Sequence, residues 1–218
     1  LDGVYMRKSL KRTTSRLHLY LVWSLLLLLL QLQVPYSKAQ SPHLDTLSSF
    51  VGVKEIGNNE GPEVPILVAL RHMGFSSGTP YCAATGSWCL DITEVRRPKV
   101  RSALATDFIK SEEVVLSKNV LHGRDTAKVG WGIVWRRGNG YHGHFGFVDS
   151  TWTGRCSWSI EANTTFQGSN EQGIVRKRRC IKPSAHTSIV AFIPTGKDGR
   201  KSKKYVNKTQ SDVWFRQD

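Results

Sequence analysis

Three residues in this sequence could together carry out nucleophilic catalysis: a cysteine, Cys82, a histidine, His144, and an acidic residue, Glu161. Pro80 stands shortly before Cys82, and small and then apolar residues follow, so we expect a loop that turns into a helix with the cysteine in its first turn. The free N–H groups and positive dipole end of a helix favour thiolate over thiol. Cys82 taken alone is better interpreted as an inert core cysteine. A base and an orienting group would make it a nucleophile.

The base and its orienting partner are expected on two adjacent strands. Residues 144–148 alternate in hydrophobicity, and the glycines that flank His144 leave one side of this strand open. Residues 157–163 also alternate, which places Glu161 and Asn163 together, opposite the apolar side chains of the same strand. Either of these two side chains can hold the tautomer of the histidine and stabilise its charge.

A second histidine leaves two alternatives open. His142 is the other candidate for the base, and His142, His144 and Cys82 could be argued as a metal site, because His-x-His on one strand face is a known ligand spacing. The sequence offers no second Cys or His pair at zinc-binding spacing. We therefore expect neither a metal nor an organic cofactor.

Hydrophobic periodicity predicts one or two helices followed by a series of antiparallel strands, which is an α+β pattern. Residues 44–50 form a short amphipathic stretch, helical segments are expected near residues 64–74, 82–90 and 102–109, and strands are expected at residues 132–135, 144–148, 157–163, 173–176 and 188–193. Residues 93–128 are otherwise polar and basic, and their structure is not predicted.

The chain is strongly basic, with 31 Lys and Arg against 17 Asp and Glu among 218 residues. Residues 1–39 combine a positive start, an apolar run from 17 to 32 and a Ser-Lys-Ala site before Gln40, which predicts a secretory signal peptide. An uncleaved membrane anchor is the alternative, and both place the domain outside the cytoplasm. Without this leader the count is 25 basic against 16 acidic residues. Such a charge attracts polyanions, and residues 196–218 form a basic tail, either solvated or polyanion-binding.

Four short motifs together resemble a known family. They are Gly-Asn-Asn-Glu-Gly-Pro at 57–62, Gly-Thr-Pro-Tyr-Cys-Ala-Ala at 78–84, Gly-His-Phe-Gly-Phe-Val at 143–148 and Ile-Glu-Ala-Asn-Thr at 160–164. In this order they resemble the CHAP family, the cysteine, histidine-dependent amidohydrolases/peptidases, which belong to the papain-like NlpC-type superfamily. The resemblance covers roughly residues 44–195.

The resemblance implies a papain-like fold in which helices carrying the cysteine pack on an antiparallel sheet carrying the other site residues. It assigns Cys82 as nucleophile, His144 as base and Glu161 as the third member of the triad, with Asn163 polarising the substrate or steadying the site. Tyr81 stands where the family often has Trp. A Gly-Trp-Gly sequence at 130–132 also stands where the family often has Gly-Asp, and neither departure removes a catalytic group.

With the predicted leader, the resemblance implies a secreted or surface-anchored cysteine hydrolase that cleaves an amide bond of peptidoglycan, as an N-acetylmuramoyl-L-alanine amidase or an endopeptidase. The alternative is a non-catalytic cell-wall-binding or secreted effector module on the same fold. We expect a monomer whose partner is peptidoglycan or another anionic cell-wall polymer. An exported chain without a nucleic-acid motif is not expected to bind nucleic acid.

Export also raises the question of disulfides among four cysteines. Cys89 lies seven residues after Cys82, two helical turns away and too far for a bond, so it is interpreted as a core residue. Cys156 and Cys180 stand at the edges of predicted strands. We predict one disulfide between them, with Cys82 and Cys89 free.

Overall fold

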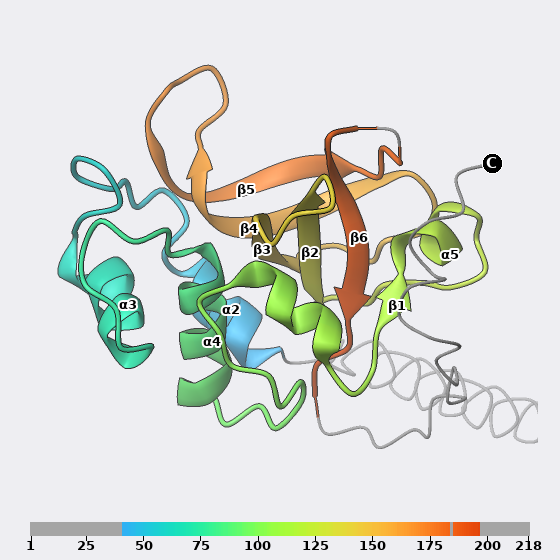
Figure 1. The fold of residues 1–218 in the computed structure, drawn as a ribbon, viewed down its shortest axis with the longest axis horizontal. Helices are drawn as coiled ribbons and strands as arrows, with labels where there is room; N and C mark the ends of the chain where they lie inside the picture. The colour runs from blue at the N-terminus through green and yellow to red at the C-terminus, as the bar shows by residue number, and fades with distance from the viewer. Residues whose placement is uncertain (1–40, 184, 197–218) are drawn as a thin grey trace, which may run out of the picture. The chain divides into compact units, whose positions relative to one another are not determined.

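The computed structural model describes residues 41–183 and 185–196, so the predicted leader (1–39) and almost all of the basic tail lie outside the described residues. The described part is an α+β unit built on an antiparallel sheet, as predicted (Figure 1), and the sheet has six strands, of which β1 was not predicted. The strand order is β1-β6-β2-β3-β4-β5. The elements are α2 (Pro42–Ser48), η1 (Glu63–Leu67), α3 (Val68–His72), α4 (Cys82–Ile92), η2 (Ala105–Lys110), β1 (Val115–Leu116), α5 (Ser117–Leu121), β2 (Gly132–Arg137), β3 (Gly143–Val148), β4 (Cys156–Thr165), β5 (Gln172–Cys180) and β6 (Thr187–Ile193).

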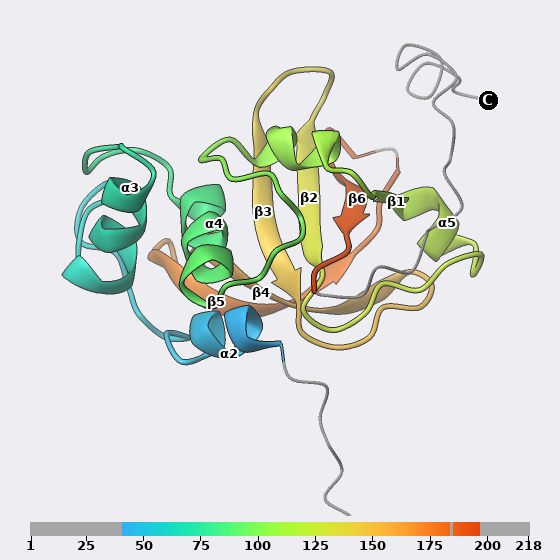
Figure 2. The same ribbon diagram turned by 90° about the horizontal axis from the view of Figure 1, so that it is seen from below.

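The helix α4 packs against the centre of the sheet and is almost completely enclosed. Its first nine residues, from Cys82 to Leu90, are all buried. Gly86 permits the close approach, because a Cβ atom there would lie 2.4 Å from the ring of Phe145 on β3. Figure 2 shows α4 running beside β3. The absence of a side chain at Gly86 therefore brings this helix close to the sheet.

The two helices predicted before and after α4 are less regular than expected. The segment predicted as one helix from 64 to 74 begins as a wide turn, η1, and becomes α-helical only in α3, which Gly74 ends with a φ of 78°. The helix predicted at 102–109 is a 3-10 helix, η2. Its Phe108 ring contacts Phe145 with a centroid separation of 4.3 Å, so η2 completes the core over β3.

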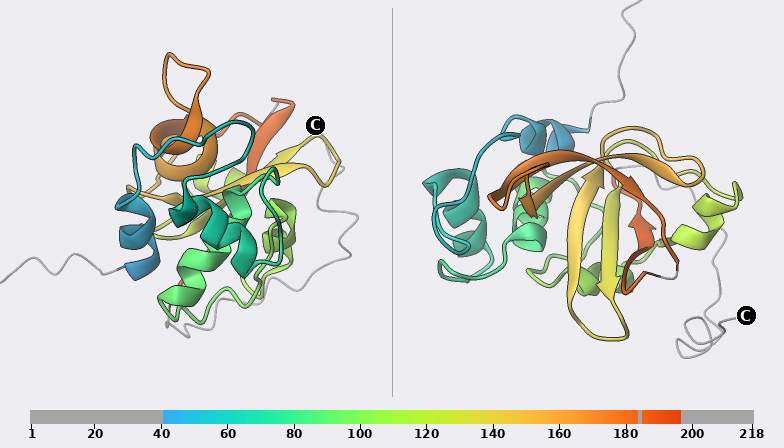
Figure 3. Two further views of the ribbon diagram at one scale, coloured as in Figure 1. Left: turned by 90° about the vertical axis from the view of Figure 1, so that its left-hand side faces the viewer. Right: turned by 90° about the horizontal axis from the view of Figure 1, so that it is seen from above.

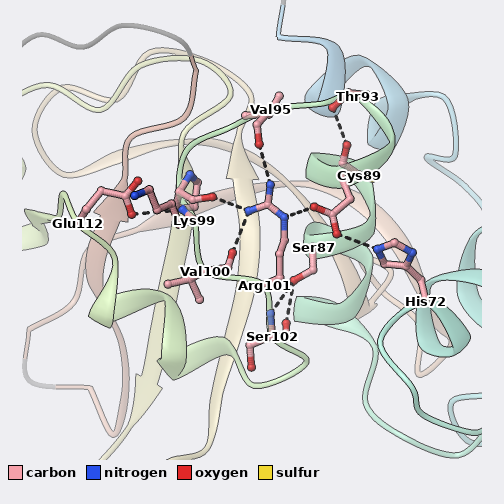
Figure 4. A network of polar contacts seen from close by, with 12 residues as sticks. His72, Ser87, Cys89, Thr93, Val95, Lys99, Val100, Arg101, Ser102 and Glu112 are labelled. Atoms are coloured by element: carbon pink, nitrogen blue, oxygen red, sulfur yellow. Dashed lines mark hydrogen bonds and ion pairs between the residues drawn. The ribbon is translucent and has the colours of Figure 1, made fainter.

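Arg101 is at the centre of the contacts that hold the polar segment after α4 (Figure 4). Arg101 donates to the carboxylate of Asp91 at the end of α4, to the carbonyl of Val95 at 2.6 Å and to that of Val100 at 2.9 Å. Asp91 also lies 2.8 Å from His72 Nε2 on α3. These contacts fix residues 93–104 without regular structure and tie them to both helices.

The short helix α2 closes the core from the side of the N-terminus. His43 on α2 is buried, with Nε2 located 2.7 Å from the carbonyl oxygen of Gly130 and its ring against Phe147 at 4.9 Å. Its Nδ1 atom has no hydrogen-bond partner. Burial lowers the pKa of His43 from 6.5, so the ring is neutral in the folded protein at neutral pH.

Within residues 41–183 and 185–196, no helix has the length and apolar character needed to cross a membrane.

Candidate active site

Cys82 is the first residue of α4, as the sequence predicts. The helix start is fixed by Thr85, whose N–H and hydroxyl both donate to the carbonyl of Tyr81, at 2.9 and 2.8 Å. The cysteine is 7% exposed. The side chain of His144 and the backbone N–H groups of Phe145 and Ala83 stabilise the thiolate form and so lower the pKa of this thiol. The thiol thus lies within a ring of donors suited to a thiolate.

The strands β3 and β4 are paired over only part of their length, which leaves part of β3 available to the Cys82 sulfur. The β3–β4 ladder pairs only residues from Gly146 to Val148 of β3, with Glu161 as the last partner on β4. Beyond Glu161 the β4 strand is irregular, and Asn163 adopts a left-handed backbone with a φ of 56°. The first half of β3 therefore has no β4 partner, and the N–H of Phe145 is available to Cys82.

His144 lies between the cysteine and the acidic residue. Its Nε2 atom donates to Glu161 Oε2 at 2.9 Å, which leaves Nδ1 as the ring nitrogen for Cys82. The ring contacts Trp135 at 5.1 Å, and 19% of its side chain is exposed. Gly146 makes the Glu161 contact possible, because a Cβ atom on this glycine would lie 2.7 Å from Glu161 Cγ.

Glu161 is completely buried and accepts hydrogen bonds from three side chains. Besides His144, Ser159 Oγ donates to Oε1 at 2.5 Å, and Arg179 on β5 donates to both carboxylate oxygens, at 2.8 and 2.5 Å. Arg179 also donates to Thr164 Oγ1 at 3.2 Å. The carboxylate is therefore shared between a histidine and an arginine.

This arrangement sets the charges of the site. Burial by itself raises the pKa of Glu161, but Arg179 and His144 bring it down to about 2. Burial lowers the pKa of His144, but hydrogen bonds and charge from Cys82 and Glu161 raise it from 6.5 to about 9. Burial raises the pKa of Cys82, but His144 and two backbone N–H groups outweigh this effect and lower it below the value of an ordinary thiol. Both shifts favour the thiolate–imidazolium form of the pair.

Asn163 does not share a face with Glu161, contrary to the predicted alternation. The irregularity in β4 turns it toward the loop before η1, where Nδ2 donates to Asn59 Oδ1 at 2.6 Å. Burial and the charge of Glu55 raise the pKa of Tyr81, whose buried hydroxyl has no hydrogen-bond partner. Asn163 connects two of the four motifs of the resemblance, since Asn59 and Asn163 belong to different ones.

The alternative base, His142, lies away from this cluster. It is exposed on the turn between β2 and β3 and stacks on Tyr141 with a centroid separation of 4.2 Å.

Sequence reasoning missed Arg179 and Ser159. The signal for Arg179 was the predicted Cys156–Cys180 disulfide, which the structure confirms. With Cys156 opposite Cys180, Arg179 lies opposite Ser157, and its side chain reaches Glu161 four residues farther along β4.

The other two cysteines are free, as predicted. Burial raises the pKa of Cys89 to about 12, so this thiol stays protonated at neutral pH, whereas the pKa of Cys82 is lowered. In the described ranges, no group of three or more His, Cys, Asp or Glu side chains is arranged to hold a metal ion. No protein-family model matches the chain, and no curated protein and no solved structure matches it significantly.

Proposed function

We propose that this protein is a secreted cysteine hydrolase of papain-like, CHAP-type fold that cleaves an amide bond of peptidoglycan. One observation carries the proposal: an unbroken series of contacts runs from Cys82 through His144 to Glu161 and ends on Arg179. A buried core cysteine does not need a raised histidine pKa or a buried carboxylate beside it. The charges of these residues match what thiol catalysis of acyl transfer requires.

In the first half-reaction the Cys82 thiolate attacks the amide carbonyl, and backbone N–H groups at the start of α4 stabilise the oxyanion. The protonated His144 ring, which donates through Nδ1, transfers its proton to the departing amine as the C–N bond breaks, leaving a thioester on Cys82. In the second half-reaction His144 takes a proton from water, the resulting hydroxide attacks the thioester, and the thiolate leaves. Glu161 keeps Nε2–H of the ring oriented throughout.

The choice of substrate rests on the sequence. The predicted leader directs the chain out of the cytoplasm, its basic charge suits an anionic wall polymer, and the four motifs resemble those of CHAP enzymes. Both classes of bond, the sugar–peptide amide and a peptide bond of the stem or bridge, suit the same thiol chemistry.

Incubation of the purified chain with peptidoglycan, followed by mass analysis of the soluble fragments, tests this function. We expect release of fragments with new amine and carboxyl ends. Cys82→Ser should abolish release without changing the melting temperature, because a serine hydroxyl is far less acidic than this thiol. Cys89→Ala is the matched control and should retain activity. Binding to peptidoglycan without any release by the wild-type chain would instead favour the non-catalytic wall-binding module.

A further inference from the structure

The hairpin formed by β4 and β5 carries a groove that the proposed mechanism does not use. Figure 3 shows the two strands curling together, with the hairpin turn projecting from the rest of the sheet. The groove has a volume of about 720 Å³ and is bounded by the turn at 165–170 and by side chains of both strands. Its aromatic and charged lining residues are Trp158, Phe166, Lys177, Arg178 and Arg179.

Positive charge dominates this groove. Three consecutive residues of β5, from Lys177 to Arg179, line it, and the lining includes no Asp or Glu. Lys177 Nζ has a neutral partner, Thr165 Oγ1 at 3.1 Å, and burial together with the charge of Arg179 lowers its pKa. Glu171, at the start of the returning chain, is paired with Lys54 outside the groove. The groove is therefore suited to a carboxylate or another anion.

The same groove presents an aromatic surface. Trp158 is 45% exposed and stands directly opposite Arg178 in the β4–β5 ladder, and Phe166 adds a second ring at the turn. An indole with one open face offers a flat apolar platform of the kind on which the C–H face of a sugar ring packs. Side-chain amides and a hydroxyl from the turn supply hydrogen-bonding groups around it. Aromatic rings next to the basic side chains of β5 are suited to binding a chain of sugars that carries acidic groups.

The groove is connected to the candidate active site through one residue. Arg179 lines the groove and also donates to both oxygens of Glu161, which in turn accepts from His144. A polymer lying in the groove is thus one side chain away from the catalytic cluster. This position favours the substrate polymer itself over an unrelated anion.

We propose that the β4–β5 groove binds an acidic glycan segment of the polymeric substrate, with a sugar ring stacked on Trp158 and carboxylates held by Lys177 and Arg178. The assignment rests on the proposed function, because peptidoglycan is the polymer that brings sugar rings and carboxylates together near the scissile amide.

Binding by the full chain carrying Cys82→Ser tests the assignment without hydrolysis. The probe is a soluble glycan–peptide fragment of peptidoglycan, compared with the same fragment after chemical amidation of its carboxylates, and the dissociation constants are measured by titration calorimetry. We expect Lys177→Gln with Arg178→Gln to weaken binding of the acidic probe roughly tenfold or more, since charge-assisted hydrogen bonds are lost. Amidation of the probe should weaken binding to a similar extent.

The matched control is Lys118→Gln with Arg124→Gln, which removes the same charge from exposed positions at and after α5, far from the hairpin turn (Figure 1). It should bind the probe within twofold of the parent. Trp158→Ala should weaken both the acidic and the amidated probe, because it removes the ring contact. Melting temperatures confirm that each variant is folded.

Equal binding by the groove variants and the control variants would overturn the inference. Tighter binding of a single-stranded oligonucleotide than of the glycan, lost in the same groove variants, would assign the groove to nucleic acid and also overturn it. The same experiments distinguish the groove assignment from the proposed function. If the wild-type chain binds the glycan through the groove but releases no fragments, only the proposed hydrolysis is contradicted. Wild-type release that the groove variants leave unchanged contradicts the groove assignment alone.

Discussion

The Glu161→Gln substitution changes a buried carboxylate that two positive side chains share. The carboxylate accepts from His144 on one oxygen and from Arg179 on both. An amide has a single acceptor oxygen, so its NH₂ group faces the donors of Arg179 in either orientation, and in one orientation it faces His144 as well. Glutamine therefore has nearly the same shape as Glu161, but its amide cannot accept the same hydrogen bonds.

The size of the effect follows from the pKa of His144. Its rise from 6.5 to about 9 corresponds to about 3 kcal/mol of preference for the protonated ring. Cys82 and Glu161 both support this preference, and assigning about half to Glu161 gives a loss of roughly tenfold in kcat/KM on the alkaline side of the pH profile and a much smaller loss at neutral pH. Removing one partner of a fully buried ion pair costs roughly 3–5 kcal/mol. We expect about 2 kcal/mol of lost stability here, because the Arg179 side chain is 30% exposed.

The assay is kcat/KM for release of peptidoglycan fragments as a function of pH, together with thermal unfolding. In the wild type the active thiolate–imidazolium pair exists above the lowered pKa of Cys82 and below that of His144, so activity rises with pH and falls again near 9. In Glu161→Gln the alkaline fall should move toward neutral pH, because the imidazolium loses its carboxylate.

Adding Arg179→Met should raise both stability and kcat/KM above those of the Glu161→Gln variant, since the amide oxygen is then free to accept from His144. Strictly additive losses in the double variant would refute the shared-carboxylate argument. If kcat/KM falls at the same alkaline pH in Glu161→Gln as in the wild type, the assignment of that fall to His144 is refuted.

Three further outcomes are expected. His144→Ala should reduce hydrolysis as severely as loss of the nucleophile, whereas His142→Ala should retain most activity; the reverse result in fragment release would move the base to His142. Gly86→Ala should lower the free energy of unfolding by about 1–3 kcal/mol, because the new methyl group overlaps the Phe145 ring; urea denaturation measures this. Stability should also fall as pH drops below about 6.5, because the unfolded chain protonates His43 before the folded one does. A His43→Gln variant should show a flatter dependence on pH in the same denaturation experiment.

The sequence predicted those features that depend on local pattern. Cys82 lies at a helix start because Pro80 and the small residues after it encode a loop followed by a helix, and Glu161 faces His144 because strand alternation holds as far as residue 161. The alternation fails two residues later, because Asn163 takes a left-handed backbone that a period of two cannot represent. The local pattern was sufficient to predict that these strands exist, but it did not predict where each strand ends.

Contacts between distant segments were outside the reach of a single sequence. Arg101 holds the segment after α4 through carbonyl groups and Asp91, and nothing in its neighbours distinguishes it from the other basic residues of that segment. Arg179 similarly stands in a basic run that looks like a solvated strand edge. Its role depends on the register of β4 and β5, which only the pairing of Cys156 with Cys180 indicated.

The disulfide at the open end of the β4–β5 hairpin also determines which face of β5 the arginine occupies. Side chains alternate between faces, so sliding β5 by one residue along β4 would turn Arg179 away from Glu161 and bring Arg178 or Cys180 to its place. Such a slip would leave a buried carboxylate with half of its cationic partners. Because Cys180 is the next residue along the chain, the covalent bond fixes the register one position from the residue whose orientation matters. The crosslink thereby converts a choice between two strand alignments into a single one.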